Sequence, residues 1–164
     1  MAGIKIIFGH RELLPIAIIA ALIGCGGPSA KQARHGFVDP LDQADNIVIF
    51  IHGVMGGAES TWLNKKTSSF WPELMRADIE LPKTNVYVVE YDSPNLKRSL
   101  NVHEIAVQTS RKLQDEGIFK KHKNIFFVTH SMGGLIAKDI LVGLKEQSLF
   151  DALVRVKVVL FIAT

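Results

Sequence analysis

The sequence contains a single cysteine, Cys25, in 164 residues. One thiol excludes an intrachain disulfide and a cysteine-rich metal site. The chain also has little excess charge, because 19 lysine and arginine residues stand against 16 aspartate and glutamate residues. A net charge of +3, scattered along the chain, is too weak to predict nucleic-acid binding. The densest basic cluster, Lys120, Lys121 and Lys123, is expected to be a solvated turn.

The apolar stretch near the amino terminus is too short to span a bilayer. It covers residues 13–23, fewer than the ~20 that a membrane helix needs, and Pro15 interrupts it. Lys5 and Arg11 precede the stretch and small residues follow it, which is the order found in a secretory signal peptide. We therefore expect residues 1–24 to be a signal peptide.

The end of this stretch, Leu22-Ile23-Gly24-Cys25, resembles the lipobox of bacterial lipoproteins. In that family the cysteine is lipidated and becomes the first residue of the mature protein. The resemblance implies a membrane-anchored lipoprotein of the bacterial cell envelope. A free thiol in an uncleaved apolar anchor is the alternative. Residues 25–45 then form a lipidated tether, rich in glycine, serine and alanine at its start.

Beyond residue 45, apolar runs alternate with helix signals. Strands are predicted for four runs rich in valine, isoleucine and phenylalanine, at 46–53, 85–91, 124–130 and 154–164. Three of these runs are apolar almost continuously, which is typical of parallel strands covered by helices on both faces. Helix signals occupy SSFWPELMRADI, NVHEIAVQTSRKLQDEG and MGGLIAKDILVGLKEQ. The second signal opens with Asn101 and Glu104 at the spacing of a capping box. The alternation predicts one α/β domain over 46–164, with a mostly parallel sheet flanked by helices.

Ser131 stands between the third predicted strand and the helix that follows, within the sequence THSMGG. Functional groups of an open parallel sheet collect beyond the carboxyl ends of its strands. A nucleophilic serine at such a place needs a tight turn with small residues on both sides, the G-x-S-x-G nucleophile elbow. Thr129 replaces the first glycine of that pattern, but the strand–turn–helix context is present. The alternative is a serine that caps an ordinary helix.

A second motif, FIHGVMGGAESTW, follows the first predicted strand. Acyl transfer develops negative charge on a carbonyl oxygen, and fixed backbone N–H groups stabilise that charge. One such donor is the N–H after the nucleophile, here that of Met132, and the other comes from a loop after an earlier strand. The glycines of the motif allow the loop to bend under the substrate. Val54 is the predicted donor in this loop, and Met55 is the next candidate.

At these two motifs the sequence resembles the α/β-hydrolase superfamily, particularly its lipase- and esterase-like members. The resemblance runs from about Asn46 to Thr164. It implies a hydrolase of carboxylic esters with Ser131 as nucleophile and the N–H groups of Val54 and Met132 as oxyanion hole. It also implies an acyl-ester or lipid substrate, and neither a metal nor an organic cofactor. The residues expected to support the elbow and the loop are His52, Gly53, His130, Gly133 and Gly134.

The superfamily's catalytic order, serine then acid then histidine, is incomplete in this sequence. All six histidines precede Ser131: His10, His35, His52, His103, His122 and His130. His52 is expected to brace the oxyanion loop rather than to act as the base. Three acids follow the serine, and all are expected to point away from it or to lie at the wrong strand end: Asp139, Glu146 and Asp151. Asp92 lies at a strand's carboxyl end but matches the family order poorly.

In the resembling family, further strands and helices follow the strand at 154–164 and deliver the acid and the histidine. The expectation is therefore a partial α/β-hydrolase fold that lacks its C-terminal strands and helices and has little activity alone. A catalytically inactive lipoprotein that binds an acyl chain or a protein partner is the alternative function. A thioesterase or acyltransferase would share the same first half.

Overall fold

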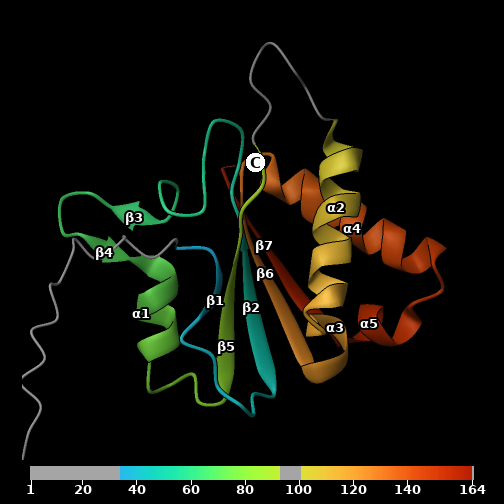
Figure 1. Ribbon diagram of the computed structural model, residues 1–164, viewed down its shortest axis with the longest axis horizontal. Helices are drawn as coiled ribbons and strands as arrows, with labels where there is room; N and C mark the ends of the chain where they lie inside the picture. The colour runs from blue at the N-terminus through green and yellow to red at the C-terminus, as the bar shows by residue number, and fades with distance from the viewer. Residues whose placement is uncertain (1–33, 93–100, 164) are drawn as a thin grey trace, which may run out of the picture. The chain divides into compact units, whose positions relative to one another are not determined.

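The computed structural model of the protein describes residues 34–92 and 101–163, so the predicted signal peptide and Cys25 lie outside it. The main sheet has five strands in the order β1-β5-β2-β6-β7 (Figure 1). Their bounds are β1 Gly36–Val38, β2 Asn46–Ile51, β5 Thr84–Val89, β6 Asn124–His130 and β7 Val156–Ile162. Only β1 is antiparallel to its neighbour, and the other three pairings are parallel. The predicted mostly parallel sheet is confirmed.

β2 is the central strand and is buried almost throughout, because apolar side chains leave both of its faces. Ile47 and Ile49 enter the larger apolar core. Val48 and Phe50 enter the smaller core on the opposite face. This two-sided burial explains why the run lacks the alternation of a half-exposed strand.

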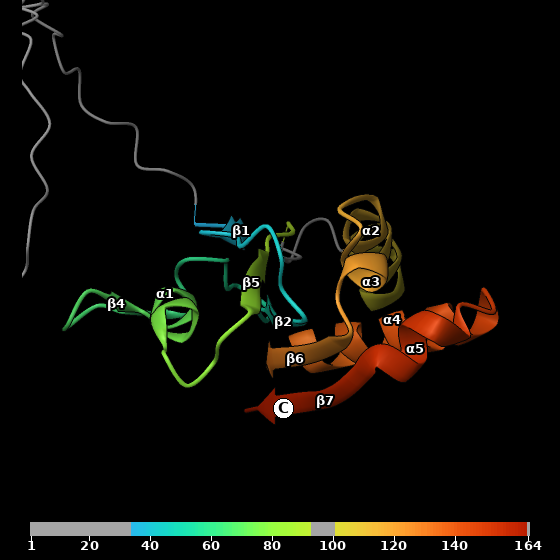
Figure 2. The same ribbon diagram turned by 90° about the horizontal axis from the view of Figure 1, so that it is seen from below.

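Four helices cover the face of the larger core, and one helix lies on the other face (Figure 2). The four are α2 Val102–Asp115, α3 Ile118–Lys121, α4 Gly133–Glu146 and α5 Phe150–Arg155. The single helix is α1 Trp71–Ala77, preceded by a ribbon of β3 Leu63–Asn64 and β4 Ser69–Phe70. The three predicted helix segments are confirmed as α1, α2 and α4. α2 begins with the expected capping box, formed by Asn101 and Glu104.

The fourth predicted strand begins two residues later than expected. Helix α5 occupies Phe150–Arg155, so β7 begins at Val156. Arg155 ends this helix and donates hydrogen bonds to the carbonyl oxygens of Lys120 (3.0 Å) and His122 (2.9 Å). An apolar run alone does not reveal such tertiary contacts, which is why the prediction placed the boundary early.

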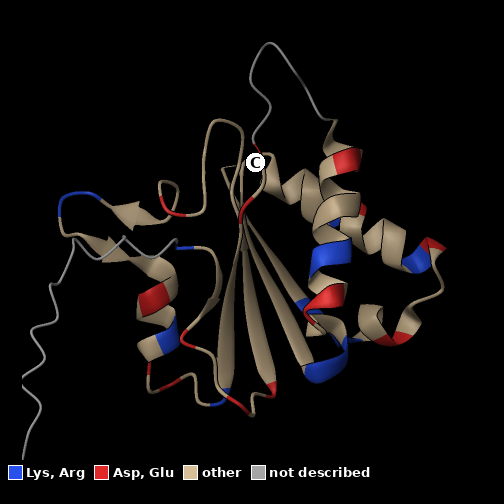
Figure 3. Ribbon diagram, in the orientation of Figure 1, with Lys and Arg blue, Asp and Glu red and all other residues tan. Residues whose placement is uncertain are grey.

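Charged residues lie on the outer helices and the connecting turns, while the central strands have almost none (Figure 3). The basic cluster Lys120, Lys121 and Lys123 is exposed, as expected. The expected turn is wrong for Lys120 and Lys121, which lie in α3, whereas Lys123 lies in the connection to β6. Lys123 pairs with Asp45 at 2.8 Å. Within the described ranges, no helix has the length and apolar character needed to cross a membrane. The same ranges contain no group of three or more potential metal ligands.

Candidate active site

Ser131 lies in a sharp turn between β6 and α4. Its backbone has φ +52°, a region that residues other than glycine seldom adopt and that marks local strain. Its N–H donates to the carbonyl oxygen of Ile162 in β7 (2.9 Å), and its own carbonyl accepts from Gly134 (3.0 Å). The side chain is partly exposed. The turn is therefore held by hydrogen bonds to β7 and α4, while the serine remains partly exposed.

Gly133 allows the first turn of α4 to lie against the end of β2. A Cβ atom at this position would clash with the carbonyl oxygen of Ile51 and lie 2.7 Å from that of His52. Thr129 stands where the first glycine of the elbow pattern is expected, and its side chain is fully buried. Its hydroxyl donates to the carbonyl oxygen of Leu160 at 2.8 Å. The threonine is tolerated because β7 provides this acceptor.

The loop after β2 approaches the serine turn closely. A Cβ atom at Gly53 would lie 2.7 Å from the Ser131 Cβ and 2.9 Å from the His130 carbonyl oxygen. Gly53 also accepts a hydrogen bond from the Gly56 N–H at 3.2 Å, which closes a turn around Val54 and Met55. The loop therefore folds over the end of β2 beside Ser131.

The two predicted oxyanion donors lie in these adjoining turns. Val54 is at a corner of the loop after β2, residues 53–58, which we call the glycine loop, and it is 46% exposed. Met132 directly follows Ser131 and precedes α4. Among the described residues, no acceptor is recorded for the N–H of either one.

His52 lies beneath the loop and is completely buried. Its ring stacks on Tyr91, with centroids 4.0 Å apart and planes 7° apart, and its Nδ1 is 3.0 Å from the Gly53 carbonyl oxygen. The Tyr91 hydroxyl donates to the His52 carbonyl oxygen at 2.5 Å. Burial, and then the negative charge of Glu90, raise the pKa of Tyr91, so the phenol keeps the proton that it donates. These contacts fit the expected bracing role of His52.

Glu90 is a site residue that the sequence reasoning missed. Its Oε2 accepts a hydrogen bond from the Ala58 N–H at 2.8 Å, and its Oε1 lies 3.3 Å from His52 Nε2. The two atoms are close enough for an ion pair but are not aligned for a hydrogen bond, because Nε2 has no hydrogen-bond partner among the described residues. A charged residue at the end of the apolar run NVYVVEY is the one signal that could have indicated it.

The remaining histidines of the described ranges are not placed as a base for Ser131. His130 has its ring 6.4 Å from that of Trp62, edge to face. His103 joins α2 to α4, with Nδ1 2.9 Å from Asp139 Oδ2, and its side chain is 68% exposed. Among the described residues, no histidine is recorded in a hydrogen bond with the Ser131 hydroxyl.

The acids considered from the sequence are not linked to Ser131 by hydrogen bonds among the described residues. Asp139 and Glu146 belong to α4, and Asp151 belongs to α5. Asp92 is exposed and follows β5. Among the described residues, none of these carboxylates pairs with a histidine that also contacts Ser131.

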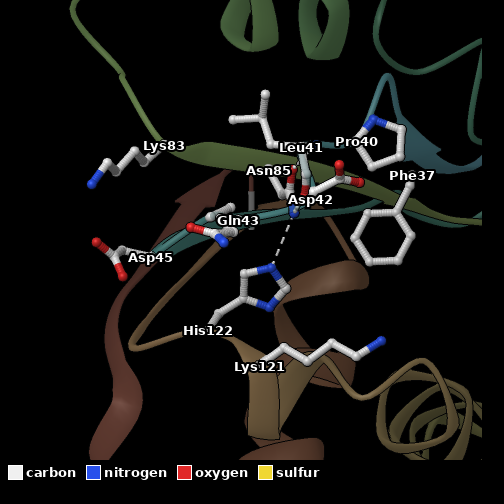
Figure 4. A pocket seen from close by; sticks show the side chains of 11 residues that line it. Phe37, Pro40, Leu41, Asp42, Gln43, Asp45, Lys83, Asn85, Lys121 and His122 are labelled. Carbon is white, nitrogen blue, oxygen red and sulfur yellow. Dashed lines mark hydrogen bonds between the residues drawn. The ribbon is translucent and has the colours of Figure 1, made fainter.

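His122 lines a pocket of about 660 Å³ (Figure 4). The pocket lies at the amino ends of β2, β5 and β6, whereas Ser131 follows the carboxyl end of β6. The Nε2 of His122 is 3.2 Å from Asn85 Nδ2, and its Nδ1 is 3.1 Å from the Ile118 carbonyl oxygen. Asn85 in turn accepts from the Leu41 N–H at 2.8 Å. Burial lowers the pKa of His122, and the Lys121 charge acts in the same direction. A neutral ring that donates through Nδ1 and accepts at Nε2 satisfies this network.

A family model described as "Putative serine esterase (DUF676)" matches residues 42–164. The chain belongs to this family. The match contains the glycine loop, the Ser131 turn and all strands of the main sheet except β1. The range matched by the DUF676 model therefore includes the elements that form the site described above.

Similar proteins include Protein SERAC1 from two vertebrates. The Danio rerio protein is 28% identical over 141 residues, which are 70% of this chain and 21% of that protein. The Bos taurus protein is 28% identical over 132 residues, 66% of this chain and 19% of that protein. This DUF676 chain thus spans about a fifth of the length of the curated relatives it matches.

Two solved structures resemble the fold more distantly. A lipase-esterase related protein from Clostridium acetobutylicum ATCC 824 has a TM-score of 0.47 at 19% identity, covering 79% of this chain and 46% of that one. Brefeldin A esterase, described as a bacterial homologue of human hormone sensitive lipase, has a TM-score of 0.42 at 10% identity. That match covers 70% of this chain and 31% of the esterase.

Proposed function

We propose that this protein is a lipase- or esterase-like serine hydrolase that cleaves carboxylic esters with Ser131 as its nucleophile. The observation that carries the proposal is the contact between two turns. The strained turn at Ser131 packs against Gly53, the first residue of the glycine loop. Membership of a serine esterase family supports the same chemistry.

In the proposed reaction, the Ser131 Oγ attacks the ester carbonyl carbon and its proton passes to a general base. The N–H groups of Val54 and Met132 stabilise the oxyanion that forms. The carbon–oxygen bond to the alcohol then breaks, and the alcohol leaves with the proton. Water hydrolyses the acyl-enzyme and releases the acid. The chemistry requires neither a metal nor an organic cofactor.

We assign the general base and its acid to residues other than those the structure describes. His52 is enclosed beneath the loop, and His103 and His122 are held by Asp139 and Asn85. Enzymes that lack one member of a catalytic triad keep only about 10³–10⁴-fold acceleration over water. Residues 34–164 alone should therefore show little turnover. A robust rate that His103→Asn removes would contradict this assignment.

The proposal places the enzyme at the bacterial cell envelope, anchored through a lipidated Cys25, with an acyl-ester or lipid as its substrate. Its support is the resemblance of residues 22–25 to a lipobox. Cys25→Ser should move the protein out of the membrane fraction into a soluble or unprocessed pool. Unchanged processing and membrane retention would contradict the anchor.

The experiment for the ester hydrolase is p-nitrophenyl butyrate turnover by the protein expressed from its intact gene. Ser131→Ala should remove the turnover above background. Ser148→Ala is the matched control, because Ser148 also has a positive φ, of 58°, but lies after α4 rather than at the sheet edge. Equal rates for the wild type and Ser131→Ala would refute the nucleophile.

One observation favours a second function, a catalytically inactive lipoprotein that binds an acyl chain or a protein partner. It is that no histidine of the described ranges is recorded in a hydrogen bond with Ser131. In that case the intact protein has no turnover, and a fluorescent fatty acid should still bind to both wild type and Ser131→Ala.

A further inference from the structure

We propose that Glu90 is a positioning residue that holds the glycine loop, residues 53–58, in the geometry of an oxyanion hole. This inference rests on the proposed serine-hydrolase function. Glu90 directly follows β5, which is hydrogen-bonded to β2 in parallel register. Its side chain therefore extends from the neighbouring strand toward the loop that leaves β2.

A single carboxylate contacts the loop at both of its ends. Oε2 accepts from the N–H of Ala58, the last loop residue, at 2.8 Å. Oε1 lies 3.3 Å from Nε2 of His52, the residue that precedes the loop. The predicted donor Val54 lies between these two points. Fixing both ends limits how far the Val54 N–H can move relative to Ser131.

The contact with Ala58 is the stronger of the two. A backbone N–H that donates to an ionised carboxylate forms a charge-assisted hydrogen bond, and 2.8 Å is within the usual range of such bonds. Gly57 lets the chain pass beside the carboxylate, since a Cβ atom there would sit at 3.6 and 3.8 Å from its two oxygens. The Glu90 side chain is 41% exposed, so water solvates the rest of the charge.

His52 transmits the same restraint to the start of the loop. Its Nδ1 contacts the Gly53 carbonyl oxygen, the group that also accepts from Gly56. Its ring is held between Glu90 and the stacked ring of Tyr91. A displacement of the Glu90 carboxylate therefore also displaces Gly53, which is in contact with Ser131.

A purely structural contact would have a different signature. Losing a partly exposed charged contact lowers stability only slightly, and a contact without a positioning role leaves the reaction rate of the folded protein unchanged. A positioning residue changes the reaction rate more than it changes folding, because a shift of about 1 Å in a catalytic group costs roughly 10²-fold in rate. Comparing rate, stability and rescue by a similar side chain separates the two roles.

The experiment uses the protein expressed from its intact gene, with Glu90→Ala, Glu90→Gln and the control Glu146→Ala. Glu146 is exposed at the end of α4, away from the loop. The first readout is kcat and KM for p-nitrophenyl butyrate. The second is hydrogen exchange of the Ala58 amide, which does not depend on catalysis. Thermal melting and circular dichroism verify that each variant is folded.

Glu90→Ala should lower kcat by up to about 10²-fold with a smaller change in KM. Its Ala58 amide should exchange about 10 to 100 times faster. Glu90→Gln keeps an oxygen that can accept from Ala58, and should recover most of both losses. Glu146→Ala should match the wild type in both readouts.

The outcomes distinguish this inference from the proposed function. If the wild type turns over substrate through Ser131 but Glu90→Ala keeps its kcat, the positioning role is wrong and the hydrolase stands. If no variant turns over substrate, the hydrolase fails. An unchanged Ala58 exchange rate in Glu90→Ala also overturns the inference, whatever the activity.

Discussion

Three of the five described histidines differ mainly in what surrounds each ring. His52 is enclosed by Tyr91, Glu90 and the loop backbone, and His103 points Nδ1 at Asp139 from an exposed position. His122 lies at the opposite end of the sheet in a network with Asn85. The rings of His52 and His122 are buried among fixed neighbours, whereas the His103 side chain is largely exposed.

The His122 network predicts a pH dependence of stability. Burial, as its first cause, lowers the pKa of His122 in the folded protein, so the unfolded chain takes up a proton at higher pH. The contribution of His122 to the free energy of unfolding should therefore be fully present above about pH 6.5, the ordinary histidine pKa. It should decrease as the pH is lowered from there. The decline continues until the lowered folded-state pKa is passed, where both states hold the proton.

Urea unfolding at pH 7.5 and pH 5.5 measures this effect. The wild type should lose more stability between the two values than His122→Gln, which does not titrate. His35→Gln replaces an exposed histidine and serves as the control. Equal losses for the wild type and His122→Gln would mean that this ring is not the acid-sensitive group.

At the scale of elements, the site depends on how closely α4 approaches β2. Gly133 is the residue at which they meet, and the groups facing it are backbone carbonyls that have little freedom to move. Gly133 lies two residues after Ser131, so this contact also positions the turn that carries the serine. At this point the backbone of α4 packs directly against the backbone at the end of β2.

Gly133→Ala should therefore reduce the free energy of unfolding by about 1–3 kcal/mol or more, since the new methyl group overpacks this contact. Gly143→Ala in the same helix is the matched control, because its Cβ would meet only Gln147 Nε2, at 3.8 Å. It should leave stability unchanged or raise it by about 0.4–1 kcal/mol. Similar losses for both, measured by chemical denaturation, would refute the close approach.

For the whole molecule, the elements with strong local signals were predictable from the sequence. Continuous apolar runs predicted β2, β5 and β6 because buried parallel strands need apolar side chains on both faces. The capping residues Asn101 and Glu104 predicted the start of α2. These signals are local, so a single sequence reveals them.

The parts that escaped prediction depend on contacts between distant residues. β1 and the β3–β4 ribbon have only two or three residues in each strand, too few for a periodic signal. The role of Glu90 depends on Ala58, 32 positions earlier in the chain. Thr129 departs from the elbow pattern, and only its bond to Leu160 explains why it fits.

The predicted site residues of the described ranges occupy two adjoining turns at one edge of the sheet. Gly53 contacts Ser131, and Gly133 contacts the backbone of β2. Cys25 lies outside the described residues, so its lipidation stays a prediction. The central claim that follows from this arrangement is that Ser131 is the nucleophile.

Fluorophosphonate labelling followed by peptide mapping tests that claim most directly. The protein expressed from its intact gene should gain one probe mass, located on the peptide that contains Ser131. Ser131→Ala should gain none, and Ser148→Ala should be labelled like the wild type. A probe found on another residue, labelling that survives Ser131→Ala, or an unlabelled wild type would contradict the account.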